Sequence, residues 1–102
     1  MSKSLENLLK IIRDRRNKNE KKSYTSSLLS SGLGNCINKL EEEFDELKVS
    51  LRDNSNIVHE VADTIYHLLV TLECANIKFE DVLEELEKRT KQSGIEEKKN
   101  RK

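Results

Sequence analysis

The chain contains no proline and only three glycines among its 102 residues. Proline interrupts the hydrogen-bond ladder of a helix, and glycine raises the conformational cost of forming one, so a chain nearly free of both can form long helices. No sustained alternation of polar residues with valine, isoleucine and threonine is present, which argues against strands. The sequence therefore predicts an all-α fold.

Apolar residues make up 34% of the chain and charged residues 37%. A domain of this size buries only about 60% of the surface that its unfolded chain exposes. With so little apolar material, we expect a core that is completed by a second subunit, most simply in a homodimer. Acidic and basic side chains number 19 each, and the absence of a basic excess argues against a nucleic-acid partner.

Neither a membrane span nor a secretion signal is evident. No apolar stretch approaches the roughly 20 residues that cross a bilayer, and the N-terminus leads directly into an amphipathic segment. Cys36 and Cys74 lack the spacing of a metal site and fall within helical patterns, which favours buried free thiols in a reducing compartment. We therefore expect a cytoplasmic protein.

The spacing of apolar residues predicts a helical bundle of four main helices, over residues 4–16, 35–52, 57–75 and 79–91, with a short helix over 26–31. We expect Thr25 to cap the short helix, and Gly32 and Gly34 to end it. The charged segment 17–22 is interpreted as a loop. Residues 1–91 would form one domain, and the polar residues 92–102 a disordered tail.

The second and third long helices carry the clearest apolar stripes. These stripes predict an antiparallel hairpin, because the turn between the helices is short. The stripe of the second helix consists of Leu33, Ile37, Leu40, Phe44, Leu47 and Leu51, and that of the third consists of Ile57, Val61, Ile65, Leu68 and Leu72.

Acidic residues flank both stripes. A helix advances about 100° per residue, which places Glu42, Glu43 and Glu46 with Lys39 on one flank of the second helix. The same rule places Glu60, Asp63 and His67 on one flank of the third, and His59 and Tyr66 elsewhere. In an antiparallel hairpin, Glu43 and Glu46 would then face Glu60 and Asp63.

Four gathered carboxylates repel one another unless a cation neutralises them. Oxygen ligands favour a hard cation, Mg²⁺ or Mn²⁺, and such sites commonly act on phosphoanhydrides. Acidic helix faces are also common where they are merely solvated. Glu60 and Asp63 argue against that alternative, because they interrupt an otherwise apolar helix and need a partner there.

Two acidic motifs and several flanking residues resemble a known family. The pattern Glu42-Glu43-x-x-Glu46, followed by Glu60-x-x-Asp63, resembles the MazG-type nucleotide pyrophosphohydrolases, which are all-α. The further elements Ser23-Tyr24-Thr25-x-x-Leu28 and Asp63-x-x-Tyr66-His67 narrow the resemblance to phosphoribosyl-ATP pyrophosphohydrolases, over about residues 5 to 90.

The resemblance implies a Mg²⁺-dependent hydrolysis of phosphoribosyl-ATP to phosphoribosyl-AMP and pyrophosphate, the second step of histidine biosynthesis. It assigns metal ligation to Glu43, Glu46, Glu60 and Asp63. Glu42 would orient or activate the attacking water. Substrate contacts would come from Lys39 and from the hydroxyl groups of Ser23, Tyr24 and Thr25, on a loop beside the site. The chain departs from the family at Glu41, where a small residue is usual, and we expect Glu41 to face away from the metal.

Several assignments stay open at this point. His67 and Arg15 fit substrate contacts, but they equally fit a hydrogen-bonded boundary histidine and a cation at a helix end. Tyr24 fits either stacking on substrate or anchoring its loop, and Tyr66 is interpreted as a packing residue. Two other functions compete with the first: a MazG-type hydrolase of free nucleoside triphosphates, and a non-catalytic helical interaction protein.

Overall fold

The computed structural model describes residues 2–16 and 23–91, and these ranges contain five α-helices and no strand. The helices are α1 (Lys3–Arg15), α2 (Tyr24–Ser30), α3 (Leu33–Asp53), α4 (Ile57–Cys74) and α5 (Phe79–Thr90). The all-α prediction is confirmed. The expected loop 17–22 and tail 92–102 lie outside the described residues.

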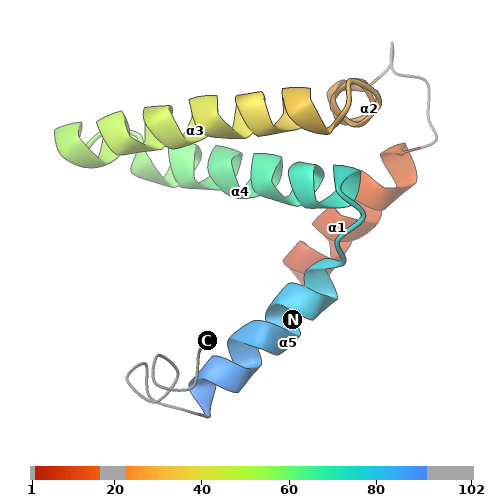
Figure 1. Cartoon of the computed structure of the whole chain (residues 1–102). Helices are drawn as coiled ribbons and strands as arrows, with labels where there is room; N and C mark the ends of the chain where they lie inside the picture. The colour runs from red at the N-terminus through yellow and green to blue at the C-terminus, as the bar shows by residue number, and fades with distance from the viewer. Residues whose placement is uncertain (1, 17–22, 92–102) are drawn as a thin grey trace.

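The two long helices α3 and α4 form the predicted antiparallel hairpin (Figure 1). Their connection is tight because Asn54 and Asn56 both adopt left-handed backbone conformations, with φ of 52° and 54°. Asparagine tolerates this region better than most residues. Asn56 occupies the cap position of α4, although its side chain makes no capping bond there.

The buried core lies at one end of this hairpin, where α1 and α2 cover it (Figure 1). Its six members are Leu9 and Ile12 of α1, Leu28 of α2, Cys36 of α3, and Leu69 and Val70 of α4. The thiol of Cys36 donates to the Leu28 carbonyl at 3.2 Å, and burial raises its pKa to about 11. Both cysteines are free, as predicted.

The contact between α3 and α4 runs along small residues. In α3, Cys36 and Ser50 are buried, and in α4 the buried residues Thr64 and Thr71 lie seven positions apart. The Thr64 hydroxyl lies 2.8 Å from the Glu60 carbonyl of its own helix and 3.4 Å from the Glu43 carbonyl of α3. Thr71 repeats the arrangement, at 2.7 Å from the His67 carbonyl and 3.3 Å from the Cys36 carbonyl. These side chains let the two backbones approach closely.

The apolar stripes lie beside this contact and are half-exposed. Phe44 keeps 46% of its surface exposed, Ile37 43% and Ile65 45%. The stripes therefore fill the hairpin's internal contact only in part, since Leu40, Leu47, Ile57, Leu68 and Leu72 are partly buried. Helical periodicity identifies an apolar face but does not identify its partner, and within the hairpin the smaller residues pack closer.

The short helix also differs from its prediction. Helix α2 begins at Tyr24, and its cap is Ser23, whose hydroxyl accepts a hydrogen bond from the Ser26 backbone N–H at 3.2 Å. Thr25 lies inside the helix, because the serine two positions earlier has the extended backbone that a cap requires. Gly32 separates the helices with φ of 95°, whereas Gly34 lies within the first turn of α3.

Helix α5 diverges from the hairpin, and none of its residues is buried (Figure 1). Its start is tied to α1 by Arg13, whose guanidinium donates to both Glu80 carboxylate oxygens at 3.0 and 2.6 Å. This hydrogen bond raises the pKa of Arg13 and lowers that of Glu80. Arg16 adds bonds to Glu73 at 2.9 Å and to Asn76 at 2.6 Å. A hollow of about 790 Å³ at this junction is lined by these residues, whose ion pairs and hydrogen bonds connect α1 to α4 and α5.

Candidate active site

Carboxylates from both helices of the hairpin converge at its edge. One oxygen from each of Glu43 and Glu46 of α3 and Glu60 of α4 lies within 4.8 Å of the others. We call these three residues the acidic cluster. The cluster forms because Glu43 lies seven residues after Cys36 and seven before Ser50, on the line where α3 contacts α4. Three of the four acids that were expected to converge thus lie together, and Asp63 is the exception.

The cluster contains negative charge that its neighbours only partly offset. Among the residues that the structure describes, none forms a hydrogen bond with the buried oxygens Glu43 Oε2 and Glu60 Oε2. Burial, followed by the negative charge of Glu46, raises the pKa of Glu43, and the nearby His67 only partly offsets this. Buried carboxylate oxygens without partners are costly. Since every atom that the cluster offers to a metal is an oxygen, the cluster fits a hard divalent cation.

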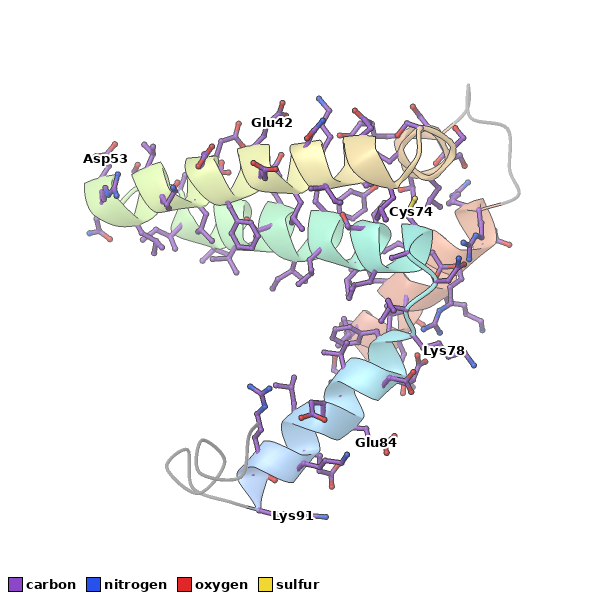
Figure 2. All side chains as sticks on the ribbon, viewed as in Figure 1. Glu42, Asp53, Cys74, Lys78, Glu84 and Lys91 are labelled. Carbon is purple, nitrogen blue, oxygen red and sulfur yellow. The ribbon has the colours of Figure 1, made fainter. Side chains whose placement is uncertain are left out.

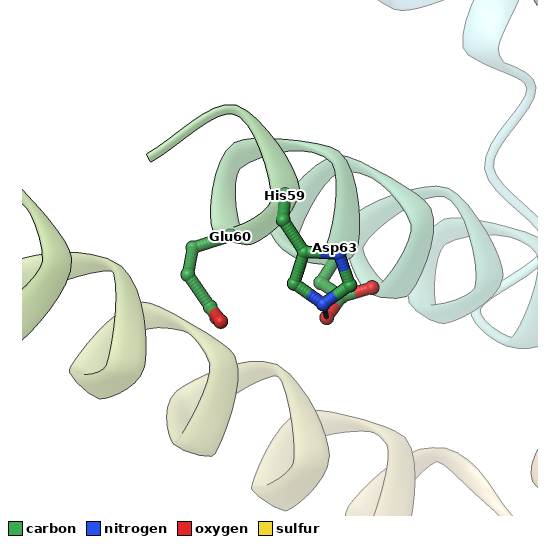
Figure 3. Close-up of side chains that lie close together, drawn as sticks. All are labelled: His59, Glu60 and Asp63. Atoms are coloured by element: carbon green, nitrogen blue, oxygen red, sulfur yellow. Dashed lines mark ion pairs between the residues drawn. The ribbon is translucent and has the colours of Figure 1, made fainter. Parts of the chain in front are cut away.

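Asp63 lies next to this cluster in a second group. One oxygen of Asp63, one of Glu60 and a ring nitrogen of His59 lie within 4.8 Å of one another. Figure 3 shows Glu60 pointing toward α3 while His59 and Asp63 lie side by side, with His59 Nε2 3.2 Å from Asp63 Oδ2. His59 was expected to point elsewhere, and its spacing of four residues from Asp63 was the signal that could have placed it here.

His67 is 7% exposed and links α4 to two other helices. Its Nδ1 lies 2.9 Å from the Asp63 backbone carbonyl, which can only accept, so Nδ1 carries the proton. Nε2 lies 3.2 Å from the Tyr24 hydroxyl and, in the neutral ring, accepts a hydrogen bond from it. Nδ1 also lies 4.0 Å from Glu43 Oε1. His67 is therefore a hydrogen-bonded residue at the core boundary, and it also lies next to the acidic cluster.

The hydroxyl residues expected on a loop lie instead at the start of α2. Ser23 caps the helix, Tyr24 contacts His67, and the Thr25 hydroxyl makes a short hydrogen bond with the Tyr66 hydroxyl. Tyr66 was expected to face elsewhere. It contacts α2 through this hydrogen bond and through its ring, which stacks beside the Tyr24 ring with centroids 6.5 Å apart.

The remaining predicted residues lie at the rim of the site or outside it. Glu42 lies on the side of α3 that faces away from α4 (Figure 2), with 62% of its side chain exposed and Lys39 Nζ at 3.5 Å. Charge on Lys39, Glu43 and Glu42 acts on the Tyr24 phenol, whose pKa is raised chiefly by burial. Within the described residues, no contact joins the Arg15 side chain to the acidic cluster, although its backbone carbonyl accepts from Ser26.

Known proteins of one family are similar to this chain over most of its length. The family model described as phosphoribosyl-ATP pyrophosphohydrolase matches residues 5–90. The chain belongs to this family. The match contains all of the acidic residues discussed above and the whole of α2, α3 and α4.

Individual phosphoribosyl-ATP pyrophosphohydrolases are similar over nearly the whole chain. A phosphoribosyl-ATP pyrophosphatase of Rhizobium etli is 41% identical over 96% of this chain and 94% of its own length. One of Methylobacterium nodulans is 41% identical over 93% and 91%. The histidine biosynthesis bifunctional protein HisIE of Helicobacter hepaticus is 46% identical over 96% of this chain, which spans 43% of that protein. Glu41, where the chain departs from the usual family pattern, is exposed.

Proposed function

We propose that the protein hydrolyses phosphoribosyl-ATP to phosphoribosyl-AMP and pyrophosphate, the second step of histidine biosynthesis, and that it depends on Mg²⁺, with Mn²⁺ as a substitute. The observation that carries the metal requirement is the pair of buried, unpartnered oxygens on Glu43 and Glu60. Family membership and the names of the relatives support the substrate.

Glu43, Glu46, Glu60 and Asp63 would hold the ion. When bound, a divalent cation offsets the charge that develops on phosphoanhydride oxygens. Asp63 pairs with His59 through Oδ2 alone, so its other oxygen, Oδ1, could bind the ion while that pair is kept. We propose that Glu43 orients the attacking water, and that Glu42 assists by turning its exposed side chain from the far side of α3 toward the ion.

The rim residues would contact the substrate. Lys39 is a cation one helical turn before Glu43, and we assign it to a phosphate oxygen. Tyr24 is 57% exposed beside the acidic cluster and offers a ring face to the base or the ribose. His67, Ser23 and Thr25 support it from within the protein, since their polar groups already have partners. Arg15 stays a weaker candidate for phosphate binding.

A homodimer would cover the half-exposed stripes of the hairpin. These stripes contribute Leu33, Ile37, Phe44, Leu51, Val61 and Ile65 to the exposed apolar surface. Contiguous apolar surface of this kind marks an interface. A second copy would also wall the acidic cluster, which lies at an edge of the single chain.

The described part of the chain has no helix capable of crossing a bilayer. We propose the cytoplasm as its location, where the thiols of Cys36 and Cys74 would stay reduced.

The test is pyrophosphate release from phosphoribosyl-ATP, ATP, dCTP and dUTP, with Mg²⁺ and with EDTA. We expect phosphoribosyl-ATP to be the fastest substrate. Glu46→Gln and Asp63→Asn should each lose about 100-fold or more in kcat, equivalent to about 2.7 kcal/mol. Glu41→Gln, an exposed neighbour outside the cluster, is the matched control. Equal activity in all variants would refute the ligand roles, and faster turnover of a free triphosphate would refute the substrate.

A further inference from the structure

Residues 23 to 27 at the start of α2 are five consecutive hydroxyl residues, and each of the first four hydroxyls has a partner inside the protein. The Ser23 hydroxyl accepts from the Ser26 backbone, and the Ser26 hydroxyl donates to the Arg15 carbonyl of α1 at 2.9 Å. The Tyr24 hydroxyl contacts His67 Nε2, and Thr25 contacts Tyr66, so both of these bonds end on α4. This run therefore docks α2 onto two other helices.

The rings of the same segment form a second set of contacts. Tyr66 packs edge-on against His67, with centroids 5.1 Å apart and planes at 88°, and it stacks beside Tyr24 at 6.5 Å and 20°. Ring pairs of this geometry contribute to stability beyond the area they bury. Tyr66, like Tyr24, uses both means, since it contacts α2 through its hydroxyl and its ring.

Helix α2 depends on such contacts for its position. It has seven residues, and isolated helices of that length are not stable in water. Its buried side chains are Ser26 and Leu28. The hydroxyl bonds therefore decide how its first turn sits against α4, and with it where the Tyr24 ring stands relative to the acidic cluster.

We propose that Tyr66 is a positioning residue for the reaction: through Thr25 it fixes the first turn of α2, and α2 in turn presents the Tyr24 ring to the substrate at the rim of the acidic cluster. The proposal rests on the proposed function for its catalytic consequence. Tyr66 itself does not touch the substrate. Loss of the Tyr66 hydroxyl should weaken substrate binding but leave metal binding unchanged. Neither the hydroxyl nor the ring of Tyr66 contacts a carboxylate of the acidic cluster.

The test compares Tyr66→Phe, which removes only the hydroxyl, with Thr25→Val, which removes its partner, and with the double variant. A half-buried hydrogen bond contributes enough for about a fivefold effect. We expect each single variant to raise KM for phosphoribosyl-ATP about fivefold with kcat within twofold of wild type. The double variant should be no worse than either single, because both remove the same bond. Thr90→Val, which removes a hydroxyl that contacts the Glu87 carbonyl within α5, is the matched control and should leave KM unchanged.

Two further readouts separate positioning from a general loss of structure. Amide hydrogen exchange should accelerate in α2 of Tyr66→Phe and stay unchanged in α3 and α4, and the rise in Tm on adding Mg²⁺ should equal that of wild type. Unchanged KM and unchanged exchange in α2, or effects that multiply in the double variant, would overturn the proposal. Faster exchange throughout α3 and α4 would overturn it too. A wild type without activity on phosphoribosyl-ATP would refute the proposed function, and exchange in α2 would then decide the docking role alone.

Discussion

Neutralising Glu43 should stabilise the metal-free protein. One oxygen from each of Glu43, Glu46 and Glu60 lies within 4.8 Å of the others. Two unit charges at about that separation repel by roughly 3.5 kcal/mol at an effective dielectric constant of about 20, and by roughly 0.9 kcal/mol in water. Because Glu46 is exposed, its repulsion is closer to the value in water. We therefore expect Glu43→Gln to gain about 1–2 kcal/mol in EDTA.

The same substitution should remove the response to metal. An ion present at about 100 times its dissociation constant stabilises a folded protein by about 2.7 kcal/mol. Wild type should gain this amount, and Glu43→Gln only a small part of it. The order of stabilities should therefore invert: the variant is more stable in EDTA, and wild type is more stable in saturating Mg²⁺.

Thermal unfolding followed by circular dichroism, at fixed protein concentration and pH 8, measures both arms. A change of 1 kcal/mol corresponds to a shift in Tm of about 4–8 °C for a domain of this size. Glu41→Gln, exposed on the same helix, should move neither arm. A lower Tm for Glu43→Gln in EDTA, or a rise with Mg²⁺ equal to that of wild type, would refute the idea that the cluster holds unneutralised charge.

Three other predictions follow from the same structure. Burial raises the pKa of Glu43 above its value in the unfolded chain, so the folded state binds more protons at this carboxylate. The free energy of unfolding of wild type in EDTA should therefore increase as pH falls from 8 toward about 4.5, and Glu43→Gln should lack this increase. Cys36, whose pKa is raised to about 11, should resist iodoacetamide at pH 8 in the native protein and react on unfolding, as peptide mass spectrometry would show; rapid native labelling would contradict its burial. Phe44→Glu should convert the proposed dimer to monomer in sedimentation experiments, since it places a charge on the exposed stripe; an unchanged oligomer would locate the interface elsewhere.

The sequence predicted the fold well where local chemistry decides it. The absence of proline and the periodic apolar residues indicated every helix, with each end within two residues. The errors have physical causes. Gly34 costs helix stability but does not break a helix, and Thr25 and Ser23 are both good caps, so the backbone of the surrounding fold selects between them.

The candidate site was partly accessible from the sequence. Spacing placed Glu43, Glu46 and Glu60 together, because the angular position of a residue on a helix follows from its number. Spacing did not reveal that Tyr66 reaches α2 or that His59 pairs with Asp63. Those contacts depend on side-chain rotamers and on the docking of a short helix, which are properties of the tertiary structure.

The threonines between α3 and α4 have a consequence for how an ion would be captured. Thr64 reaches the Glu43 carbonyl at 3.4 Å, so the separation of the two backbones beside the acidic cluster is set by side chains that bear no charge. Folding alone therefore brings the acids together, so binding of the proposed cation would require no further ordering of the two helix backbones. The affinity of the proposed metal site would therefore depend on these threonines, and a bulkier residue at position 64 would weaken metal binding without changing any of the proposed ligands.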